Sequence, residues 1–403
     1  MTMTLAGEKK TNKGYFALLV VYLALDYGRI HDTFGFGFAR PLMIMTLILI
    51  WMIIKSGGFE ALRIRQVRMM TLFILLLALH VPFARNTFYA YHATRAMFLY
   101  MPFIIGCIIC LNSIERLKHM LLVCVAIMAY VSMYAITHHG RGPGAYFADE
   151  NDLSLYINMW IPFCFFLFSV EQSRAKKIFL VTSMVLGLLA IVASVSRGGI
   201  VGLIAVFFVI WIFSRRKVAS LFVIAVLGLL IIAFSDEGWR REMATMTDMR
   251  EHTAKERIES WKSGWKMFLD NPLGVGGNNF LVRFQEYQTE YFQRGMYGRA
   301  AHSLWFTLMP ELGIAGIVIY MLLLYYNIKD ILFLKSIDSK GTDEDRIYLN
   351  HVGRGLIGSL AGFFASASFL SVLYYAHYWY LTGLIVAAVR IPRSYSRENG
   401  TAG

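Results

Sequence analysis

The apolar residues of this chain gather in blocks of about twenty residues, and this pattern constrains the fold more than any other feature. A helix of about 20 residues crosses the hydrocarbon layer of a bilayer, which is roughly 30 Å thick. Backbone polar groups find no water in that layer, so they must pair within the crossing segment, as they do in a helix. The pattern therefore predicts an all-α polytopic membrane protein.

Composition supports this interpretation. Hydrophobic residues make up 57% of the 403 residues and charged residues only 16%, whereas about 25% charged residues are usual in soluble domains. That hydrophobicity excludes a disordered chain. Four cysteines are too few for a disulfide scaffold, and because all four lie in apolar blocks we expect them to be buried thiols.

About twelve segments have the length and hydropathy of a membrane span. The expected spans are 15–30, 38–54, 69–84, 96–111, 118–137, 152–170, 177–196, 198–214, 218–235, 302–326, 348–372 and 374–390.

The charge of the chain is formally +13, from 39 Lys and Arg against 26 Asp and Glu. In a soluble protein such a balance would indicate nucleic acid as a partner. Here the basic residues alternate between connections: 22 fall in the inner segments and 6 in the short outer ones when the N-terminus is placed in the cytoplasm. Cytoplasmic loops carry the excess of Lys and Arg. We therefore expect cytoplasmic N- and C-termini, contact with membrane lipids and no nucleic acid.

The longest connection is 236–301, between the ninth and tenth expected spans, and long loops cross the membrane with little regard to charge. Its segment 249–268 places Trp261 and Trp265 at helical spacing, and turn residues follow at 270–274. We expect two or three amphipathic helices that cap the outer face of the bundle. The predicted organisation is a bundle of spans 1–9 (1–235), the outer helical loop (236–301), and spans 10–12 with a cytoplasmic tail (302–403).

Two arginines are candidate phosphate ligands, because a guanidinium keeps its charge and donates two parallel hydrogen bonds. Arg197 lies between two apolar blocks and is followed by two glycines; alternatively, it is a snorkelling side chain at a tight turn. Arg257 shares a helix face with Trp261 and Trp265. The alternative for this face is an ordinary amphipathic helix at the membrane interface.

His302 lies where the outer loop meets the tenth expected span. A neutral imidazole there can act as a general base towards a hydroxyl group, although a lone His at a span start is more often an interfacial or capping side chain. The acidic run 149–152, which contains Asn151, is interpreted as the start of the sixth span rather than as a metal site. No cofactor motif or metal-ligand spacing is present, so we expect neither. Candidate substrate-binding residues are Trp261, Arg141, Asn151, Gly276 and Asn278.

At this point the ordered set of motifs resembles the bacterial O-antigen ligase superfamily over roughly 140–325. The segment 142–153 is similar to ligases of the exosortase-associated O-glycosylation branch. Many ligases of the superfamily have His-Asn where this chain has His302-Ser303. The motifs are Ser196-Arg197-Gly198, Arg257-x-x-x-Trp261, Asn271-Pro272-Leu273-Gly274-x-Gly276, His302 and Glu311-Leu312-Gly313-Ile314-x-Gly316.

The resemblance implies a glycosyltransferase of the bacterial inner membrane, in lipopolysaccharide biosynthesis, with its cap in the periplasm. The donor is a glycan on polyprenyl (undecaprenyl) pyrophosphate, and the acceptor is a hydroxyl of lipid A core, a protein or another glycan. Arg197 and Arg257 would stabilise the leaving pyrophosphate without a metal, and His302 would be the base of an inverting transfer. Two alternatives remain: a glycan polymerase that uses the same donor, and a lipid-linked glycan flippase or transporter.

Overall fold

The computed structural model describes residues 13–214, 252–292, 298–337 and 343–398, together with isolated residues between 217 and 237. Within these residues every regular element is an α-helix or a short 3-10 helix, so the predicted all-α architecture is confirmed. The first helices are α1 (Lys13–Asp26), α2 (Ile30–Thr33), α3 (Pro41–Ser56), α4 (Arg65–His80), α5 (Thr87–Cys110), α6 (Ile114–Thr137), α7 (Glu150–Phe168), α8 (Arg174–Ala193) and α9 (Arg197–Phe213). The later helices are α12 (His252–Asp270), α13 (Phe280–Tyr287), α14 (Leu304–Ser336), α15 (Glu344–Ala367) and α16 (Ala376–Glu398).

The helices follow the apolar blocks of the sequence. In the described part of the chain, six helices are long and apolar enough to cross a membrane, and α1 and α9 are shorter apolar helices. The chain is therefore a polytopic membrane protein. The expected ninth span, 218–235, lies mostly outside the described residues, as does the start of the outer loop at 236–251. The total of twelve spans stays a prediction. The six long segments are Gly37–Ser56, Arg65–Phe83, Thr87–Cys110, Ile114–Thr137, Arg174–Ala193 and Leu304–Ser336.

Predicted span ends differ from the structure: the tenth span was expected to end at 326, whereas α14 runs to Ser336, and the end of the eleventh span differs as follows. The sequence pattern ran the eleventh span to 372, but α15 ends at Ala367 and residues 368–375 form an irregular connection to α16. Phe369, Leu370, Val372 and Leu373 made this stretch resemble a continuing span. Leu370, Val372 and Leu373 are buried inside the protein, where a non-helical backbone at membrane depth is tolerated.

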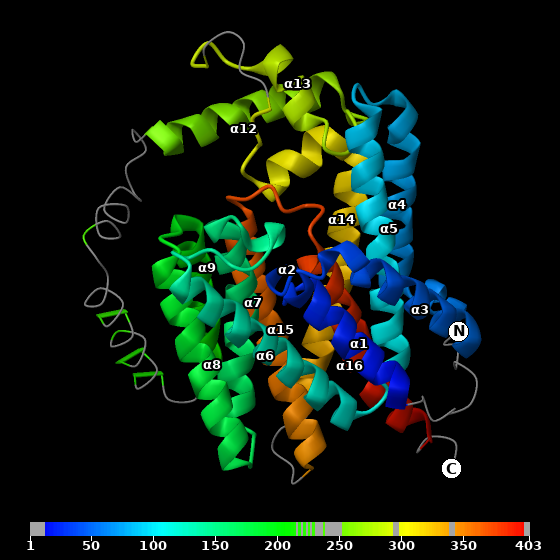
Figure 1. The fold of residues 1–403 in the computed structure, drawn as a ribbon, viewed down its shortest axis with the longest axis vertical. Coiled ribbons are helices and arrows are strands. Elements are labelled where there is room, and N and C mark those ends of the chain that lie inside the picture. Colours follow the sequence, from blue (N-terminus) through cyan, green and yellow to red (C-terminus); the bar gives the residue numbers. More distant parts are fainter. Residues whose placement is uncertain are drawn as a thin grey trace.

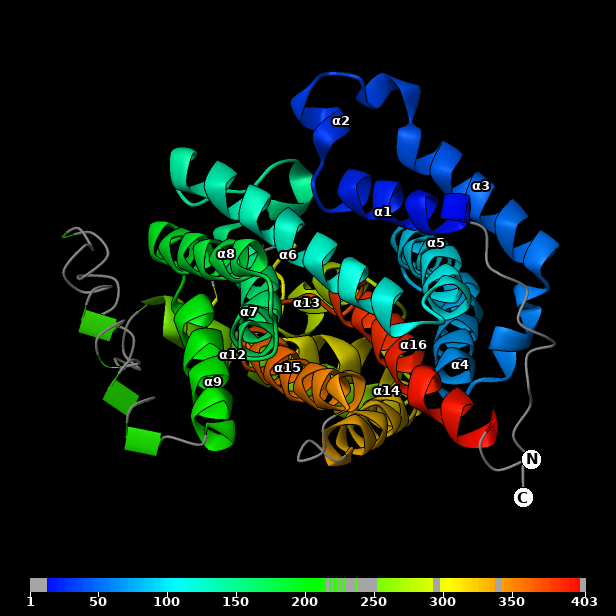
Figure 2. The ribbon, with the colours of Figure 1, turned by 90° about the horizontal axis from the view of Figure 1, so that it is seen from below.

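Helix α7 lies at the centre of the bundle, among α6, α8, α9 and α15 (Figure 2). Almost all its residues are buried. Its closest partner is α15, whose Gly355, Gly358 and Gly362 recur every three or four residues. A Cβ atom on any of them would meet atoms of α7 within 2.8 Å. Small residues at this spacing let two helices approach closely in a membrane.

Helices α12 and α13 lie across one end of the bundle (Figure 1). They share a small hydrophobic core of their own that includes Met267, Phe280, Phe284 and Ala301. The connection between α15 and α16, orange-red in the picture, lies at the end of the bundle that faces α12. The predicted helix over 249–268 is confirmed as α12, which ends at Asp270 beside the expected turn residues. Its first predicted residues, 249–251, lie outside the described residues.

The loop after α12 is fastened to a break in α14. Gly313 has φ 61° and interrupts that helix. The freed backbone groups pair with the loop: Val275 N–H donates to the Pro310 carbonyl (2.9 Å), and Ile314 N–H donates to the Pro272 carbonyl (2.9 Å). A side chain at Gly313 would meet the Pro272 carbonyl oxygen at 2.3 Å. The two Gly-containing motifs at 271–276 and 311–316 are therefore two halves of one contact.

Candidate functional site

Arg197 is presented by a tight turn between two helices. Helix α8 ends at Ala193 and α9 begins at Arg197 itself. The Ser196 hydroxyl accepts the backbone N–H of Gly199 at 2.9 Å and caps α9. Such capping fixes the first turn of a helix, so the backbone that carries the half-buried guanidinium is well defined.

Trp261 holds α12 against the bundle. Its indole stacks on Phe306 with ring centroids 5.4 Å apart and lies 6.2 Å from the ring of Phe369. Its Nε1–H donates to the Ala301 carbonyl oxygen at 3.0 Å. Arg257 lies one helical turn earlier on the same face of α12. The indole therefore places Arg257 close to the segment that leads to His302.

His302 lies just before α14, which begins at Leu304 and has Ser303 as its N-cap residue. The backbone of His302 has φ 47°, an uncommon left-handed conformation for a non-glycine residue. Its N–H donates to the Ser371 hydroxyl in the α15–α16 connection at 2.9 Å. These constraints keep the imidazole at the junction of α12, α14 and that connection.

The surroundings of His302 favour its neutral form. Burial lowers the pKa of His302 from its ordinary value of 6.5, and the nearby positive charges of Arg257 and Arg299 lower that pKa further. The carboxylates of Asp149 and Glu256 act in the opposite direction. Arg299 is itself bound to Glu256 at 2.8 Å, so its charge is partly compensated. A neutral imidazole has one ring nitrogen free to accept a proton.

The α8–α9 turn, which carries Arg197, contacts Phe369, and Phe369 also contacts Trp261. A Cβ atom placed on Gly198 would lie 3.8 Å from the Cβ atom of Phe369, and the Trp261 indole contacts the ring of that phenylalanine. The α8–α9 turn, α12 and the start of α14 thus meet around residues 368–375. The three predicted catalytic residues come from the start of α9 (Arg197), from α12 (Arg257) and from the segment just before α14 (His302). Figure 1 shows α12 and α13 across one end of the bundle.

Asn151 and Arg141 lie beside this group but differ in their contacts. The Asn151 amide oxygen accepts the Ser196 hydroxyl at 2.6 Å, and its amide nitrogen donates to Asp149 at 2.9 Å. Arg141 is exposed and lies 3.6 Å from Glu150 in an ion pair. Asn151 is therefore committed to the turn that carries Arg197, while Arg141 stays at the rim.

Gly276 and Asn278 lie in a separate cluster. The Asn278 N–H donates to one carboxylate oxygen of the buried Glu311 at 2.8 Å, and Tyr374 donates its hydroxyl to the same oxygen at 2.6 Å. A side chain at Gly276 would lie 2.8 Å from the Cβ atom of Ala84. This loop is packed against α4, α14 and the α15–α16 connection. The structure does not bring Gly276 or Asn278 into contact with His302.

Several residues of the site were missed at the sequence level. Ser371 and Phe369 lie in a segment interpreted as part of a span, and for Asp149 the start of a helix was favoured over a metal ligand or a base. The capping itself is confirmed, because the Asp149 side chain accepts the N–H of Asn151 at 2.8 Å. Arg299 stood among the ten basic residues of the outer loop. The polar residues Ser368 and Ser371 inside an apolar run were available signals for the connection.

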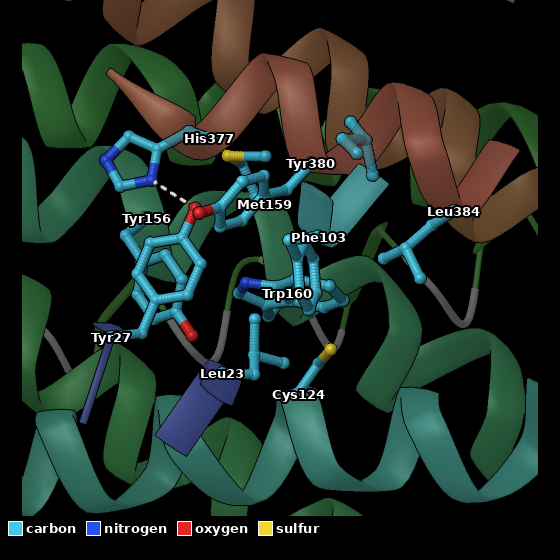
Figure 3. Close-up of a pocket in the computed structure, with 11 residues that line it drawn as sticks. Leu23, Tyr27, Phe103, Cys124, Tyr156, Met159, Trp160, His377, Tyr380 and Leu384 are labelled. Carbon is cyan, nitrogen blue, oxygen red and sulfur yellow. Dashed lines mark hydrogen bonds between the residues drawn. The ribbon is translucent and has the colours of Figure 1, made fainter. Parts of the chain in front are cut away.

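The interior of the bundle also contains a small apolar cavity, drawn in Figure 3. Aromatic side chains and Cys124 line most of it, and the hydroxyl of Tyr27 lies 3.1 Å from Nδ1 of His377 at its edge. None of the predicted site residues lines this cavity. All four cysteines are buried and unbonded, as expected. We interpret the cavity as part of the packing of the bundle.

Comparison with known protein families finds a match over part of the chain. No curated protein matches the chain. The family model described as O-antigen ligase matches residues 182–321, which run from within α8 into α14. The matched stretch includes Arg197, Arg257 and His302, whereas Asn151 and Arg141 precede it. Residues 182–321 are therefore an O-antigen ligase domain, and the chain that carries this domain is a multi-pass membrane protein.

Proposed function

We propose that the protein transfers a glycan from a polyprenyl-pyrophosphate donor to an acceptor hydroxyl at the periplasmic face of the bacterial inner membrane. What supports this proposal is that the segments that carry Arg197, Arg257 and His302 lie around the α15–α16 connection. Two guanidinium groups and a neutral imidazole are the groups that such a transfer needs.

The chemistry follows from the bond that breaks. When the sugar–phosphate bond is cleaved, the pair of electrons leaves with the pyrophosphate and negative charge develops on its oxygens. Positive groups placed in advance at that position stabilise the transition state. In our proposal Arg197 and Arg257 supply this charge, so the reaction is independent of a metal ion. His302 accepts the proton of the acceptor hydroxyl as it attacks the opposite face of the anomeric carbon, which inverts that carbon.

The remaining predicted residues take different roles in this proposal. Trp261 borders the sugar next to the pyrophosphate, and the exposed Arg141 meets the glycan or acceptor at the rim. Asn151, Gly276 and Asn278 act on substrate indirectly, because their polar or backbone groups bind neighbouring loops.

We also propose twelve spans with cytoplasmic termini, organised as the bundle 1–235, the periplasmic helical loop 236–301 and the final spans 302–403. The positive-inside count supports this orientation. It is further supported by the site's place at the end of the bundle covered by α12 and α13 (Figure 1). The orientation puts that site on the side from which a donor in the periplasmic leaflet approaches.

A reaction with purified components tests the proposal. The enzyme is incubated with a polyprenyl-pyrophosphate glycan and, separately, with lipid A core, protein or glycan acceptors, each with and without a chelator. We expect glycan on one acceptor, release of polyprenyl pyrophosphate and no loss of rate with chelator. Lengthened lipid-linked glycan would instead identify a polymerase. A donor that remains intact with every acceptor contradicts the proposal.

A further inference from the structure

Helix α7 carries a polar stripe that faces the turn of Arg197. Asn151, Ser154 and Asn158 are spaced by three and four residues, which places them on one face of the helix. Each of them hydrogen-bonds to the turn or to the first residues of α9. Asn151 accepts the Ser196 hydroxyl (2.6 Å), the Ser154 and Ser194 hydroxyls are 2.7 Å apart, and the Asn158 amide donates to the Gly199 carbonyl (2.8 Å).

The stripe is buried and closely fitted. Ser154 and Asn158 are each 0% exposed, and Ser194 and Ser196 are nearly as buried. A Cβ atom on Gly199 would lie 2.5 Å from the Cβ atom of Ser154. Burying a polar group costs free energy unless the group is hydrogen-bonded. Packing of α7 against α9 would need only apolar side chains, so the hydrogen bonds point to a requirement for a defined geometry.

The turn that the stripe holds contains an unusual backbone conformation. Val195 has φ 52°, in the left-handed region that a β-branched residue rarely adopts. Strained residues of this kind persist where the surrounding structure fixes them, and they cluster at functional sites. Arg197 follows two residues later as the first residue of α9. The stripe hydrogen-bonds to Ser194, which precedes Val195, and to Ser196 and Gly199, which follow it.

We propose that Asn151, Ser154 and Asn158 are positioning residues that hold the Val195 turn and, through it, the guanidinium of Arg197. The inference rests on the proposed role of Arg197 in stabilising the leaving pyrophosphate. The stripe also reaches the other half of the site, because Asn151 donates to Asp149 at 2.9 Å and the Asp149 carboxylate acts electrostatically on His302. One face of α7 therefore holds the turn that carries Arg197.

A double-mutant cycle between Ser154 and Arg197 tests the inference. Ser154→Ala removes one hydroxyl of the stripe, and Ser194 keeps a second partner in the Ile191 carbonyl at 2.7 Å. A displacement of about 1 Å at a catalytic group costs up to about 10²-fold in rate. We expect Ser154→Ala to lower kcat by about 10- to 100-fold and to leave KM for the donor within about twofold of the wild-type value, because Arg197 acts in the transition state.

The same substitution is then made in an Arg197→Lys background, which keeps the charge but loses the planar fork. There Ser154→Ala should change kcat by less than about twofold, because residues that act through one another are not additive. Ser132→Ala is the matched control: Ser132 is also buried in the bundle, and within the described residues its hydroxyl has no hydrogen-bond partner. Its kcat should equal that of the wild type. If Ser154→Ala fails to assemble, Ser194→Ala removes the same hydrogen bond from the side of the turn.

The possible failures are distinguishable. Equal losses from Ser154→Ala in both backgrounds would show an independent structural role and would overturn the inference alone. A second contrary result is a wild-type kcat in Ser154→Ala together with a lowered kcat in Arg197→Lys. It would overturn the inference about the stripe and leave the proposed role of Arg197 intact. A wild-type rate in Arg197→Lys would remove the proposed role of Arg197 and overturn both.

Discussion

The Trp261 indole donates its Nε1–H to the Ala301 carbonyl oxygen at 3.0 Å, one residue before His302. This hydrogen bond connects the helix that carries Arg257 to the backbone that carries the imidazole. Arg257 and His302 themselves are 45 positions apart in the sequence. The relationship between Arg257 and His302 therefore depends on how α12 docks, and the first prediction addresses that docking.

Trp261→Phe should retain most of the docking, because a phenyl ring can still stack on Phe306. The hydrogen bond to Ala301 is lost, and one such bond contributes about 0.5–1.5 kcal/mol. We expect kcat/KM to fall by no more than about tenfold in this variant and by clearly more in Trp261→Ala, measured in the donor-and-acceptor reaction. Wild-type rates in both variants would show that the indole has no part in placing Arg257.

Arg257→Ala and His302→Ala should each lower the transfer rate by about 10²–10³-fold, the usual cost of removing one group that stabilises a transition state. Both proteins should still purify as folded membrane proteins. Lys262→Ala is the matched control on the same helix, because Lys262 is 61% exposed and pairs with Glu259 on the surface. A rate in Arg257→Ala that equals the rate of Lys262→Ala would remove Arg257 from the site.

The pH dependence of transfer should reflect the lowered pKa of His302. Only the neutral imidazole accepts a proton, so kcat/KM should fall as the pH drops through that pKa, at an apparent value below 6.5. Arg299→Gln removes a positive charge that disfavours the imidazolium. It also leaves the Glu256 carboxylate, which favours the imidazolium, without its ion-pair partner. The acid limb of the profile should therefore move to higher pH. A limb that stays in place, or moves to lower pH, contradicts the assignment of His302 as the base.

The contact between the outer loop and the break in α14 should be a large contributor to stability. Gly313→Ala introduces a Cβ atom that would lie 2.3 Å from the Pro272 carbonyl oxygen, in addition to the cost of a non-glycine residue at positive φ. Gly57→Ala is the matched control, because Gly57 also has positive φ but no atom within 4 Å of its Cβ position.

We expect Gly57→Ala to cost about 1 kcal/mol and Gly313→Ala to cost clearly more, measured as thermal unfolding in detergent. Hydrogen exchange should rise at residues 272–280 in Gly313→Ala only. Similar unfolding temperatures for the two variants would show that the loop is not fastened to the helix.

The sequence predicted the helical fold because the membrane imposes a length and an apolar composition on each span. It failed at 368–375, where Phe369, Leu370, Val372 and Leu373 are apolar because the connection is packed within protein and not because it is helical. Hydropathy does not distinguish these two reasons. Since His302 binds Ser371 in that connection, the error also hid one side of the candidate site.

The candidate residues divide in a similar way. Arg197, Arg257 and His302 were proposed from the sequence because charged groups near apolar blocks are rare and are usually functional. The partners of Asn151 were not predictable, since its bond to Ser196 joins residues 45 positions apart. Likewise, Gly276 and Asn278 were interpreted as contacts of substrate, and only the fold reveals that Glu311 binds the backbone N–H of Asn278.

The central claim is that the two arginines and the histidine converge on the pyrophosphate of a lipid-linked glycan. The most direct measurement is a structure of the enzyme with polyprenyl pyrophosphate bound. The account predicts phosphate oxygens within hydrogen-bond distance of both Arg197 and Arg257, with the His302 imidazole facing the position of the anomeric carbon. A pyrophosphate bound away from these guanidinium groups, or at the opposite end of the bundle, would contradict it.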